Sequence, residues 1–191
     1  MRRIRFVLFA FLLGSITAAD SAGAGEVEVW SALRSGRHVA LLRHADAPGG
    51  FGDPPGFRVD DCATQRNLSA TGRADAQRIG ARLRSERIAV DRILSSPWCR
   101  CIDTATLLKL GPVEPEPTFG NVVVLRDQRE SLTAGGRAVI DQWTGSGILL
   151  VVTHGANIRA LTGIQPASGE IVVVRGGSGG GREPVGRLIL D

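Results

Sequence analysis

The chain has 191 residues, of which 43% are hydrophobic and 22% are charged, and its formal net charge is +4 at pH 7. This length allows one substantial hydrophobic core and is too short for two. Basic residues do not cluster with aromatic ones, which argues against a nucleic-acid-binding protein. We therefore expect one globular domain and no nucleic-acid partner.

The first 24 residues have the pattern of a secretory signal peptide. Three arginines precede the uncharged apolar run 6–16, and small residues at 22–24 offer a cleavage site. Because the apolar run is shorter than the ~20 residues that a membrane span needs, an uncleaved anchor is the weaker alternative. Removal of 1–24, which holds three arginines and one aspartate, lowers the formal charge from +4 to +2.

We therefore predict a signal peptide over 1–24 and a domain over 25–191. The mature protein is expected in the periplasm, with no stable membrane anchor. The Arg2-Arg3 pair does not decide between the general and the twin-arginine export route.

Hydrophobic periodicity and turn residues predict strands that alternate with helices. In the first half of the chain we expect a helix at 27–33, a strand at 38–42, a long loop at 45–67, and a helix at 70–85 capped by Ser69. A strand at 92–94 and a helix with Pro97 in its first turn, which stops at Gly111, should follow. The expected later elements are a strand or edge at 122–125, a helix at 132–143, a strand at 148–153, and hairpin strands at 171–174 and 188–190 around a flexible glycine-rich connector. This alternation indicates an α/β protein.

Two of the expected strands end at histidines. The strand at 38–42 runs into Arg43-His44, and the strand at 148–153 runs into His154. If both lie in one parallel sheet, their carboxyl ends face the same crevice, which is where ligands bind in open α/β sheets. We therefore expect the two histidines to share a pocket. The third histidine, His38, begins a strand and is expected to be structural.

Arginine and histidine side chains at strand ends suit a phosphoryl group. Arginine forks match phosphate oxygens bidentately and stabilise the charge that spreads over them in the transition state. A neutral imidazole can attack phosphorus when an acceptor holds its other ring nitrogen. His44 and His154 are thus candidate catalytic residues, and Arg43 and Arg100 candidate substrate-binding residues. The alternative interpretation is that the arginines serve ion pairs and the histidines are ordinary residues.

Four short motifs then carry a resemblance to a known family. They are Leu42-Arg43-His44-Ala45, Leu68-Ser69-Ala70-Thr71-Gly72, Ser95-Ser96-Pro97-Trp98-Cys99-Arg100 with Thr104-Ala105, and Val152-Thr153-His154-Gly155. In their order and spacing over roughly 37–165, they resemble the histidine phosphatase superfamily, also called phosphoglycerate mutase-like. The exported chain with the segment 61–68 further resembles small periplasmic members, among them phosphatases of lipopolysaccharide-core heptose phosphate.

The resemblance implies a fold and a mechanism. The fold would be a three-layer α/β/α sandwich with a mostly parallel central sheet. His44 would carry a phosphohistidine intermediate, and Arg43, Arg100 and His154 would form the phosphate pocket. Ala45 stands where many members have glycine, and we expect this change to be tolerated.

The general acid is less clearly placed. Many members carry a glutamate or aspartate after the second arginine motif, and in this chain that segment is 114–121. The candidates are Glu116 and Glu114, with Asp46 added because it is close in sequence to His44. The alternative interpretation is that both glutamates belong to a solvated loop.

Three cysteines allow one disulfide in an oxidising compartment and leave one thiol free. Cys99 and Cys101 are too close in sequence for an easy mutual bridge. We expect Cys62 to pair with Cys99, with Cys62 to Cys101 as the alternative. No metal site is expected, since the chain has neither a CxxC pair nor a cluster of histidine and cysteine.

The sequence therefore predicts an exported phosphatase that hydrolyses phosphomonoesters through phosphohistidine and needs no cofactor. Its partner would be a small phosphorylated substrate, with phosphosugars among the candidates. Two alternatives stay open: a phosphate-ligand-binding protein of the same fold without activity, and a phosphomutase.

Overall fold

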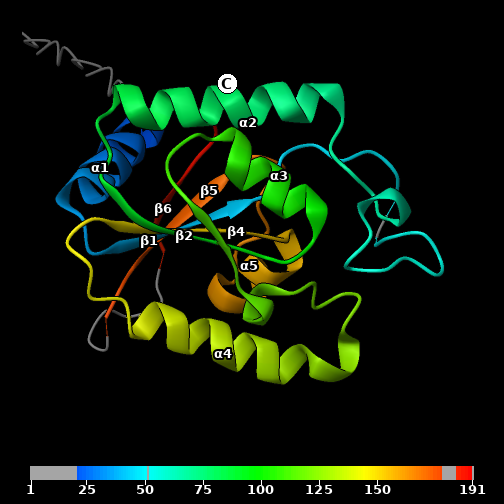
Figure 1. The fold of residues 1–191 in the computed structure, drawn as a ribbon. Coiled ribbons are helices and arrows are strands. Elements are labelled where there is room, and N and C mark those ends of the chain that lie inside the picture. Colours follow the sequence, from blue (N-terminus) through cyan, green and yellow to red (C-terminus); the bar gives the residue numbers. More distant parts are fainter. Residues whose placement is uncertain (1–20, 51, 178–183, 191) are drawn as a thin grey trace, which may run out of the picture.

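The computed structural model describes residues 21–50, 52–177 and 184–190, and it shows a mixed six-stranded sheet flanked by helices (Figure 1). The helices are α1 (Ser21–Ser35), α2 (Ala70–Ser85), α3 (Cys99–Leu107), α4 (Arg129–Asp141) and α5 (Gly155–Thr162). The strands are β1 (His38–Arg43), β2 (Val90–Ser95), β3 (Val113–Pro115), β4 (Ile148–Thr153), β5 (Ile171–Arg175) and β6 (Pro184–Leu188). Short 3-10 helices lie at Cys62–Thr64, Pro117–Phe119 and Arg126–Gln128.

Most of the predicted signal peptide, and most of the glycine-rich connector, lie outside the described residues. Helix α1 begins at Ser21, so it crosses the predicted cleavage position. In the part of the chain that the structure describes, no helix has the length and apolar character needed to cross a membrane.

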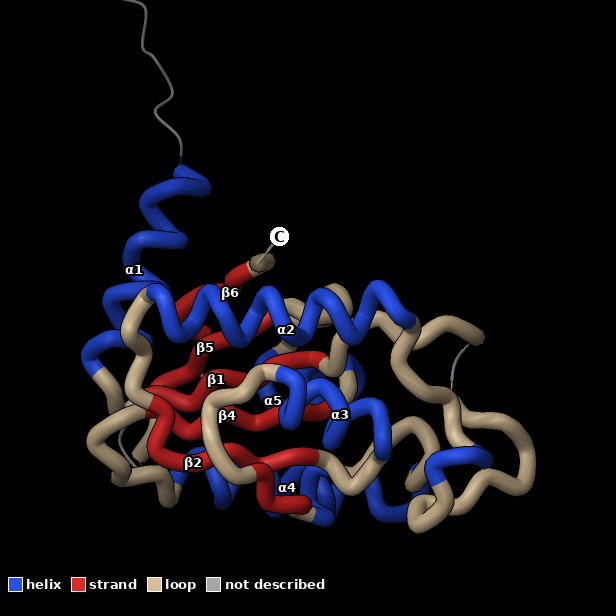
Figure 2. The backbone as a smooth tube through the Cα atoms, turned by 45° about the horizontal axis from the view of Figure 1, so that its top comes forward, coloured by secondary structure: helices blue, strands red, loops and turns tan. Residues whose placement is uncertain are grey.

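The strands follow the order β3-β2-β4-β1-β5-β6 across the sheet. The pairs β3 with β2, β2 with β4 and β4 with β1 are parallel, whereas β5 is antiparallel to both β1 and β6. The predicted α/β fold with a mostly parallel sheet is thus confirmed. Strand β4 lies between β1 and β2 and is parallel to both, so the residues that follow these three strands meet at one edge of the sheet (Figure 2).

Both faces of the sheet are covered, which explains why β4 is buried at every position and apolar from Ile148 to Val152. Leu150 and Val152 pack in the cluster formed with α1, α2 and α3, and Leu149 and Val151 pack in the cluster formed with α4 and α5. Side chains of a strand alternate between faces, so a strand buried on both sides reads as a continuous hydrophobic run. Figure 1 shows the two helical layers on opposite sides of the sheet.

The start of α2 explains the motif at 68–72. The Ser69 hydroxyl accepts a hydrogen bond from the backbone N–H of Gly72 at 2.8 Å and caps the helix as predicted. A Cβ at Gly72 would overlap the carbonyl oxygen of Asp46. The serine therefore begins the helix, and the glycine lets it pack directly against the loop that follows His44.

One element prediction is wrong. Residues 122–125 form a turn and not a strand, because the Asn121 carbonyl accepts hydrogen bonds from the backbone N–H groups of Val124 (3.0 Å) and Leu125 (2.8 Å). The Asn121 side-chain oxygen also accepts from Val123 N. Asparagine competes in this way for backbone donors that a strand would use for its ladder.

Several boundaries also differ from the prediction. Pro97 precedes the N-cap Trp98 rather than lying in the first turn of α3, and α3 ends at Leu107 instead of reaching Gly111. Helix α4 begins at Arg129, and strand β6 ends at Leu188 where the predicted strand began. Neither N-cap residue, Trp98 of α3 or Gln128 of α4, makes a side-chain capping hydrogen bond, so no capping signal in the sequence marked these helix starts.

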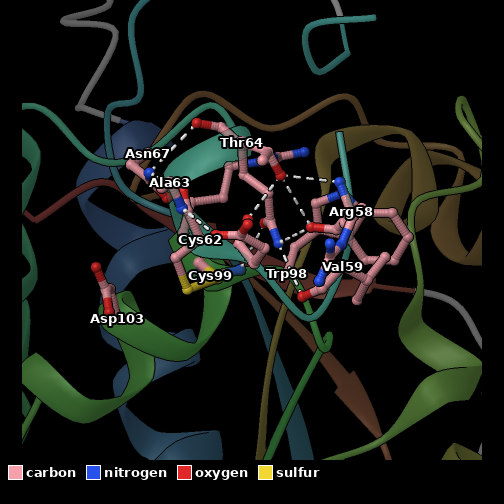
Figure 3. The surroundings of a disulfide bond; sticks show 12 residues. Arg58, Val59, Cys62, Ala63, Thr64, Asn67, Trp98, Cys99 and Asp103 are labelled. Carbon is pink, nitrogen blue, oxygen red and sulfur yellow. Dashed lines mark hydrogen bonds between the residues drawn. A yellow bond between two sulfur atoms is a disulfide. The ribbon is translucent and has the colours of Figure 1, made fainter. Parts of the chain in front are cut away.

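The predicted disulfide between Cys62 and Cys99 is present, with the two Cα atoms 5.7 Å apart, and Cys101 is a buried free thiol. Figure 3 shows that the bridge joins the segment around the 3-10 helix at Cys62–Thr64 to the start of α3. On the loop side, the Asn67 side chain donates to the Cys62 carbonyl at 2.6 Å. The bridge therefore ties the long loop to the helix that carries Arg100.

Replacement of Cys62 and Cys99 by serine should lower the free energy of unfolding by about 3 to 4 kcal/mol, because the bridge no longer restricts the unfolded chain. Denaturant unfolding of the oxidised protein and of the double variant measures the difference. A reductant should reproduce the loss in the wild type and add nothing in the double variant. A Cys62–Cys101 peptide, or three free thiols in the native protein, would contradict the assignment.

Candidate active site

A cavity of about 470 Å³ lies at the carboxyl ends of β1 and β4. Basic and imidazole side chains dominate its wall: Arg43, His44, Arg66, His154 and Arg159. The first residues of α5, Gly155 and Ala156, also line it. Within the described ranges, no group of three or more His, Cys, Asp or Glu side chains is placed to hold a metal ion.

His44 is buried at the end of β1 with one ring nitrogen held. Its Nδ1 lies 2.9 Å from the Ala45 carbonyl oxygen, so Nδ1 carries the proton and donates it, and Nε2 keeps a lone pair. Burial is the main cause that lowers the pKa of His44 to about 3; the hydrogen bond to Ala45 opposes it, and the positive charge of Arg100 acts in the same direction as burial. The Thr104 hydroxyl accepts from Ala45 N at 3.1 Å and fixes the backbone beside the ring. His44 is therefore a neutral imidazole with one free nitrogen.

His44 should stay neutral as the pH falls from about 8 to about 5, because its pKa is lowered from 6.5 to about 3. An NMR titration of the ring resonances tests this, and a midpoint near 6.5 would contradict it. The unfolded chain binds a proton at His44 below pH 6.5 that the folded state does not bind. The stability conferred by the neutral His44 is therefore complete above pH 6.5 and declines as the pH falls from there towards about 3.

His154 faces His44 across the cavity, and their ring centroids are 5.5 Å apart. Its Nε2 lies 2.9 Å from the Ser96 hydroxyl, and its Nδ1 lies 3.5 Å from an Arg100 nitrogen. Because the arginine can only donate, Nδ1 is the acceptor and the proton sits on Nε2. The pKa of His154 lies well below its usual value, mainly because the ring is buried and secondly because His44 is close to it. The structure thus places both predicted histidines in one pocket, both neutral.

Arg43 passes along the wall of the cavity beside α5. Its Nη1 donates to the Pro166 carbonyl at 2.8 Å, whereas its buried Nε makes no hydrogen bond to any described residue. A Cβ at Gly155 would lie 3.3 Å from Arg43 Cδ and 3.4 Å from Nε. The glycine after His154 therefore leaves room for the arginine, whose orphaned Nε is suited to an anionic ligand.

Arg100 lies beside His154 and does not line the cavity. Both side chains of the Arg100–Asp53 ion pair are 0% exposed, and the pair is bidentate, with Nη1 to Oδ1 at 2.7 Å and Nη2 to Oδ2 at 3.2 Å. Trp98 Nε1 donates to the same carboxylate at 3.0 Å. Direct contact between Arg100 and phosphate stays a prediction. In this structure its side-chain partners are Asp53, the Arg66 carbonyl at 3.2 Å and His154.

Sequence reasoning missed Arg66, which lines the cavity opposite α5. Its Nε donates to the Gly52 carbonyl at 3.0 Å, and its backbone N–H donates to Asp53 Oδ1 at 3.1 Å. The only local signal was its place inside the segment 61–68 that resembles the periplasmic family members. Its position in the site depends on the fold of the loop around Asp53.

None of the three candidate general acids lines the cavity. Glu114 pairs with Arg92 on the exposed side of β3, with a closest approach of 2.6 Å. Glu116 caps the 3-10 helix at Pro117–Phe119 by accepting from Thr118 N, and Asp46 accepts from the Ser69 hydroxyl at 2.6 Å. Each carboxylate thus has a local structural contact outside the cavity.

The fold and the site define an α/β protein with an arginine-lined pocket that contains two neutral histidines. A family model described as "Histidine phosphatase superfamily (branch 1)" matches residues 39–123. No curated protein matches the sequence. The matching segment contains β1 except its first residue, together with α2, β2 and α3, and therefore His44 and both predicted arginines.

Several solved structures share the fold of this chain. The protein histidine phosphatase SixA, solved with tungstate, is 18% identical with a TM-score of 0.51, over 79% of this chain and 92% of that chain. Phosphoglycerate mutase from Thermus thermophilus is 18% identical with a TM-score of 0.54, over 81% and 99%. A mycobacterial glucosyl-3-phosphoglycerate phosphatase is 16% identical with a TM-score of 0.52, over 72% and 89%. The family model thus matches the part of the chain that holds His44, and these neighbours share its fold.

Proposed function

We propose that this protein is a phosphatase that hydrolyses phosphomonoesters through a phosphohistidine intermediate on His44. The observation that carries the proposal is the His44 ring. Its Nδ1 proton is donated to the Ala45 carbonyl, and its Nε2 is unprotonated in a cavity lined by Arg43 and Arg66. A neutral imidazole held in this way is a competent nucleophile over the whole neutral pH range.

The proposed reaction has two steps. The Nε2 lone pair attacks phosphorus, and the bond from phosphorus to the leaving oxygen breaks as that oxygen takes up a proton. A water molecule then attacks phosphorylated His44, which releases inorganic phosphate and restores the neutral ring. Arg43, Arg66 and the amino-terminal end of α5 would stabilise the equatorial oxygens in both steps.

The rate should depend steeply on the leaving group. The carboxylates nominated as general acids have local partners and do not line the cavity, so protonation of a poor leaving group receives little help. We expect aryl and acyl phosphates to react much faster than alkyl phosphates. A plot of log kcat/KM against leaving-group pKa measures this dependence. A flat plot would mean that a general acid acts in the site.

The proposal also includes where the protein works and which substrates it acts on. We propose that the protein works in the periplasm, which is supported by the signal-peptide pattern at 1–24 and by the Cys62–Cys99 bridge, a feature of oxidising compartments. Phosphosugars, including lipopolysaccharide-core heptose phosphate, are candidate substrates. Fractionation of the native host with an antibody against the chain tests the location. A cytoplasmic protein with reduced Cys62 would refute it.

The test of the activity is phosphate release by the purified full chain from a panel of sugar, nucleotide, aryl and lipid phosphates. Turnover together with a trapped phosphoryl-His44 supports the proposal. Binding without turnover would favour the non-catalytic alternative. Transfer of labelled phosphate to a second hydroxyl of the substrate would favour a phosphomutase.

A further inference from the structure

We propose that the substrate carries a second anionic group, a carboxylate or another phosphate, which binds Arg159 while the reacting phosphoryl group lies at His44. This inference rests on the proposed function and narrows its substrate class. The other three arginines at the site serve the phosphoryl group or the loop, and Arg159 is placed apart from them.

The size of the cavity requires more than a phosphoryl group. At about 470 Å³ it falls in the range of roughly 300–1,000 Å³ that is typical of pockets for whole small-molecule ligands. The phosphoryl group would occupy the end near His44 and Arg43. The remaining wall, which includes Arg159, would contact the rest of the substrate.

The geometry of α5 directs Arg159 toward this remaining space. Gly155 and Ala156, in the first turn of the helix, line the cavity, and Arg159 follows them at positions i+4 and i+3 on the same face. Its Cα is about 5 to 6 Å further along the helix axis. Because helical side chains tilt toward the amino terminus, the guanidinium extends back to the mouth of the cavity.

The other arginines are already engaged by the protein. Arg43 and Arg66 hold backbone carbonyls, and Arg100 is paired with Asp53. The Arg159 side chain is exposed and makes no hydrogen bond or ion pair with residues 21–50, 52–177 or 184–190. Its guanidinium is therefore available to a ligand.

The charges on the cavity wall also favour a substrate with a second anionic group. Its wall carries the positive charges of Arg43, Arg66 and Arg159, while His44 and His154 are neutral and no carboxylate is among the residues that line it. A phosphoryl dianion balances two of these charges. A second anion on the substrate would balance the third, and charge-assisted contacts to arginine are the strong class of hydrogen bond.

The experiment compares 3-phosphoglycerate with glycerol 3-phosphate, which differ mainly in a carboxylate in place of a hydroxymethyl group. Wild-type full chain should show at least about tenfold higher kcat/KM for the carboxylate compound. Arg159→Gln should reduce this preference about tenfold, and Arg159→Lys should retain part of it. Arg78→Gln removes an exposed arginine on α2 that pairs with Asp75, and should leave the preference unchanged. Fructose 1,6-bisphosphate against fructose 6-phosphate repeats the test with a second phosphate.

The outcomes separate this inference from the proposed function. Equal kcat/KM for both members of each pair, or the same preference in Arg159→Gln as in the wild type, would overturn the inference while turnover itself stands. If no compound is hydrolysed, the phosphatase proposal fails, and calorimetric binding of the same compounds then tests Arg159 independently. In that case, tighter binding of 3-phosphoglycerate that is lost in Arg159→Gln supports the second subsite, and equal binding rejects it.

Discussion

Replacement of His44 by alanine is expected to lower phosphate release by at least about a thousandfold, the largest effect of any single change in this protein. His154 cannot substitute as the nucleophile, because its Nε2 carries a proton directed at Ser96 and its Nδ1 faces Arg100. Initial rates with an aryl phosphate measure the loss. Acid quenching of the wild type should trap an acid-labile, base-stable phosphoryl adduct that is absent from the variant.

His38→Ala is the matched control for this experiment. His38 begins β1, at the opposite end of the strand from the cavity, and its Nδ1 lies 2.6 Å from the Gly36 carbonyl oxygen. This variant should keep both turnover and the phosphoryl adduct. Activity retained in His44→Ala would remove His44 from the mechanism.

Replacement of Asp53 by alanine should lower the free energy of unfolding by about 3 to 5 kcal/mol, the cost typical of leaving a buried charge without its partner. Arg100 and Asp53 are both fully buried and joined by two hydrogen bonds, so Arg100 would lose the carboxylate that compensates its charge. Denaturant unfolding measures the change. Activity should fall as well, because Asp53 also accepts from the backbone of Arg66.

Two comparisons isolate the buried pair. The double variant Asp53→Ala with Arg100→Met should recover part of the lost stability, since no uncompensated charge remains. Asp60→Ala removes an aspartate that pairs with Arg58 on the surface, and should leave stability nearly unchanged. If Asp53→Ala were as stable as Asp60→Ala, the buried pair would not form in solution.

The Arg100–Asp53 pair should make the stability of the folded protein sensitive to acid. Burial raises the pKa of Asp53, but the hydrogen bonds from Arg100 and from Arg66 N outweigh burial and hold the pKa below its ordinary value of 3.8. The folded state therefore favours the carboxylate more than the unfolded state does. Its stabilisation is complete well above pH 3.8 and is lost as the pH falls through the lowered value.

Asp53 and the Cys62–Cys99 bridge fasten the same loop in two ways. The ion pair joins the loop to Arg100, and the disulfide joins it to the preceding residue of α3. Arg66, which lies between Asp53 and α2 in the chain, is thereby held at the cavity. Stability and site geometry are coupled here, so reduction of the bridge should disturb the position of Arg66 before the sheet unfolds.

Features encoded by neighbouring residues could be predicted from the sequence. The apolar runs of β1 and β4 predicted two strands that deliver His44 and His154 to one edge, because a strand buried on both faces needs such a run. Ser69 marked the start of α2, since its side chain caps a backbone donor only three residues away. Cysteine number and spacing indicated that Cys62 takes part in a bridge and favoured Cys99 over Cys101 as its partner, and the structure confirms Cys99.

Other features arise only when distant segments meet in the tertiary structure. Asp53 and Arg100 are 47 residues apart, and no local pattern indicated that this carboxylate would engage the predicted phosphate ligand. Arg66 and Arg159 come from different elements and reach one cavity because the loop and α5 are packed against the same strand ends. The sequence by itself determined the strands, the two histidines at their ends and Cys62 as one half of the disulfide, because these depend on local periodicity, capping and the number and spacing of the cysteines. Only the tertiary structure decided which arginines face the cavity and which is neutralised, because burial and pairing depend on neighbours that are remote in the chain.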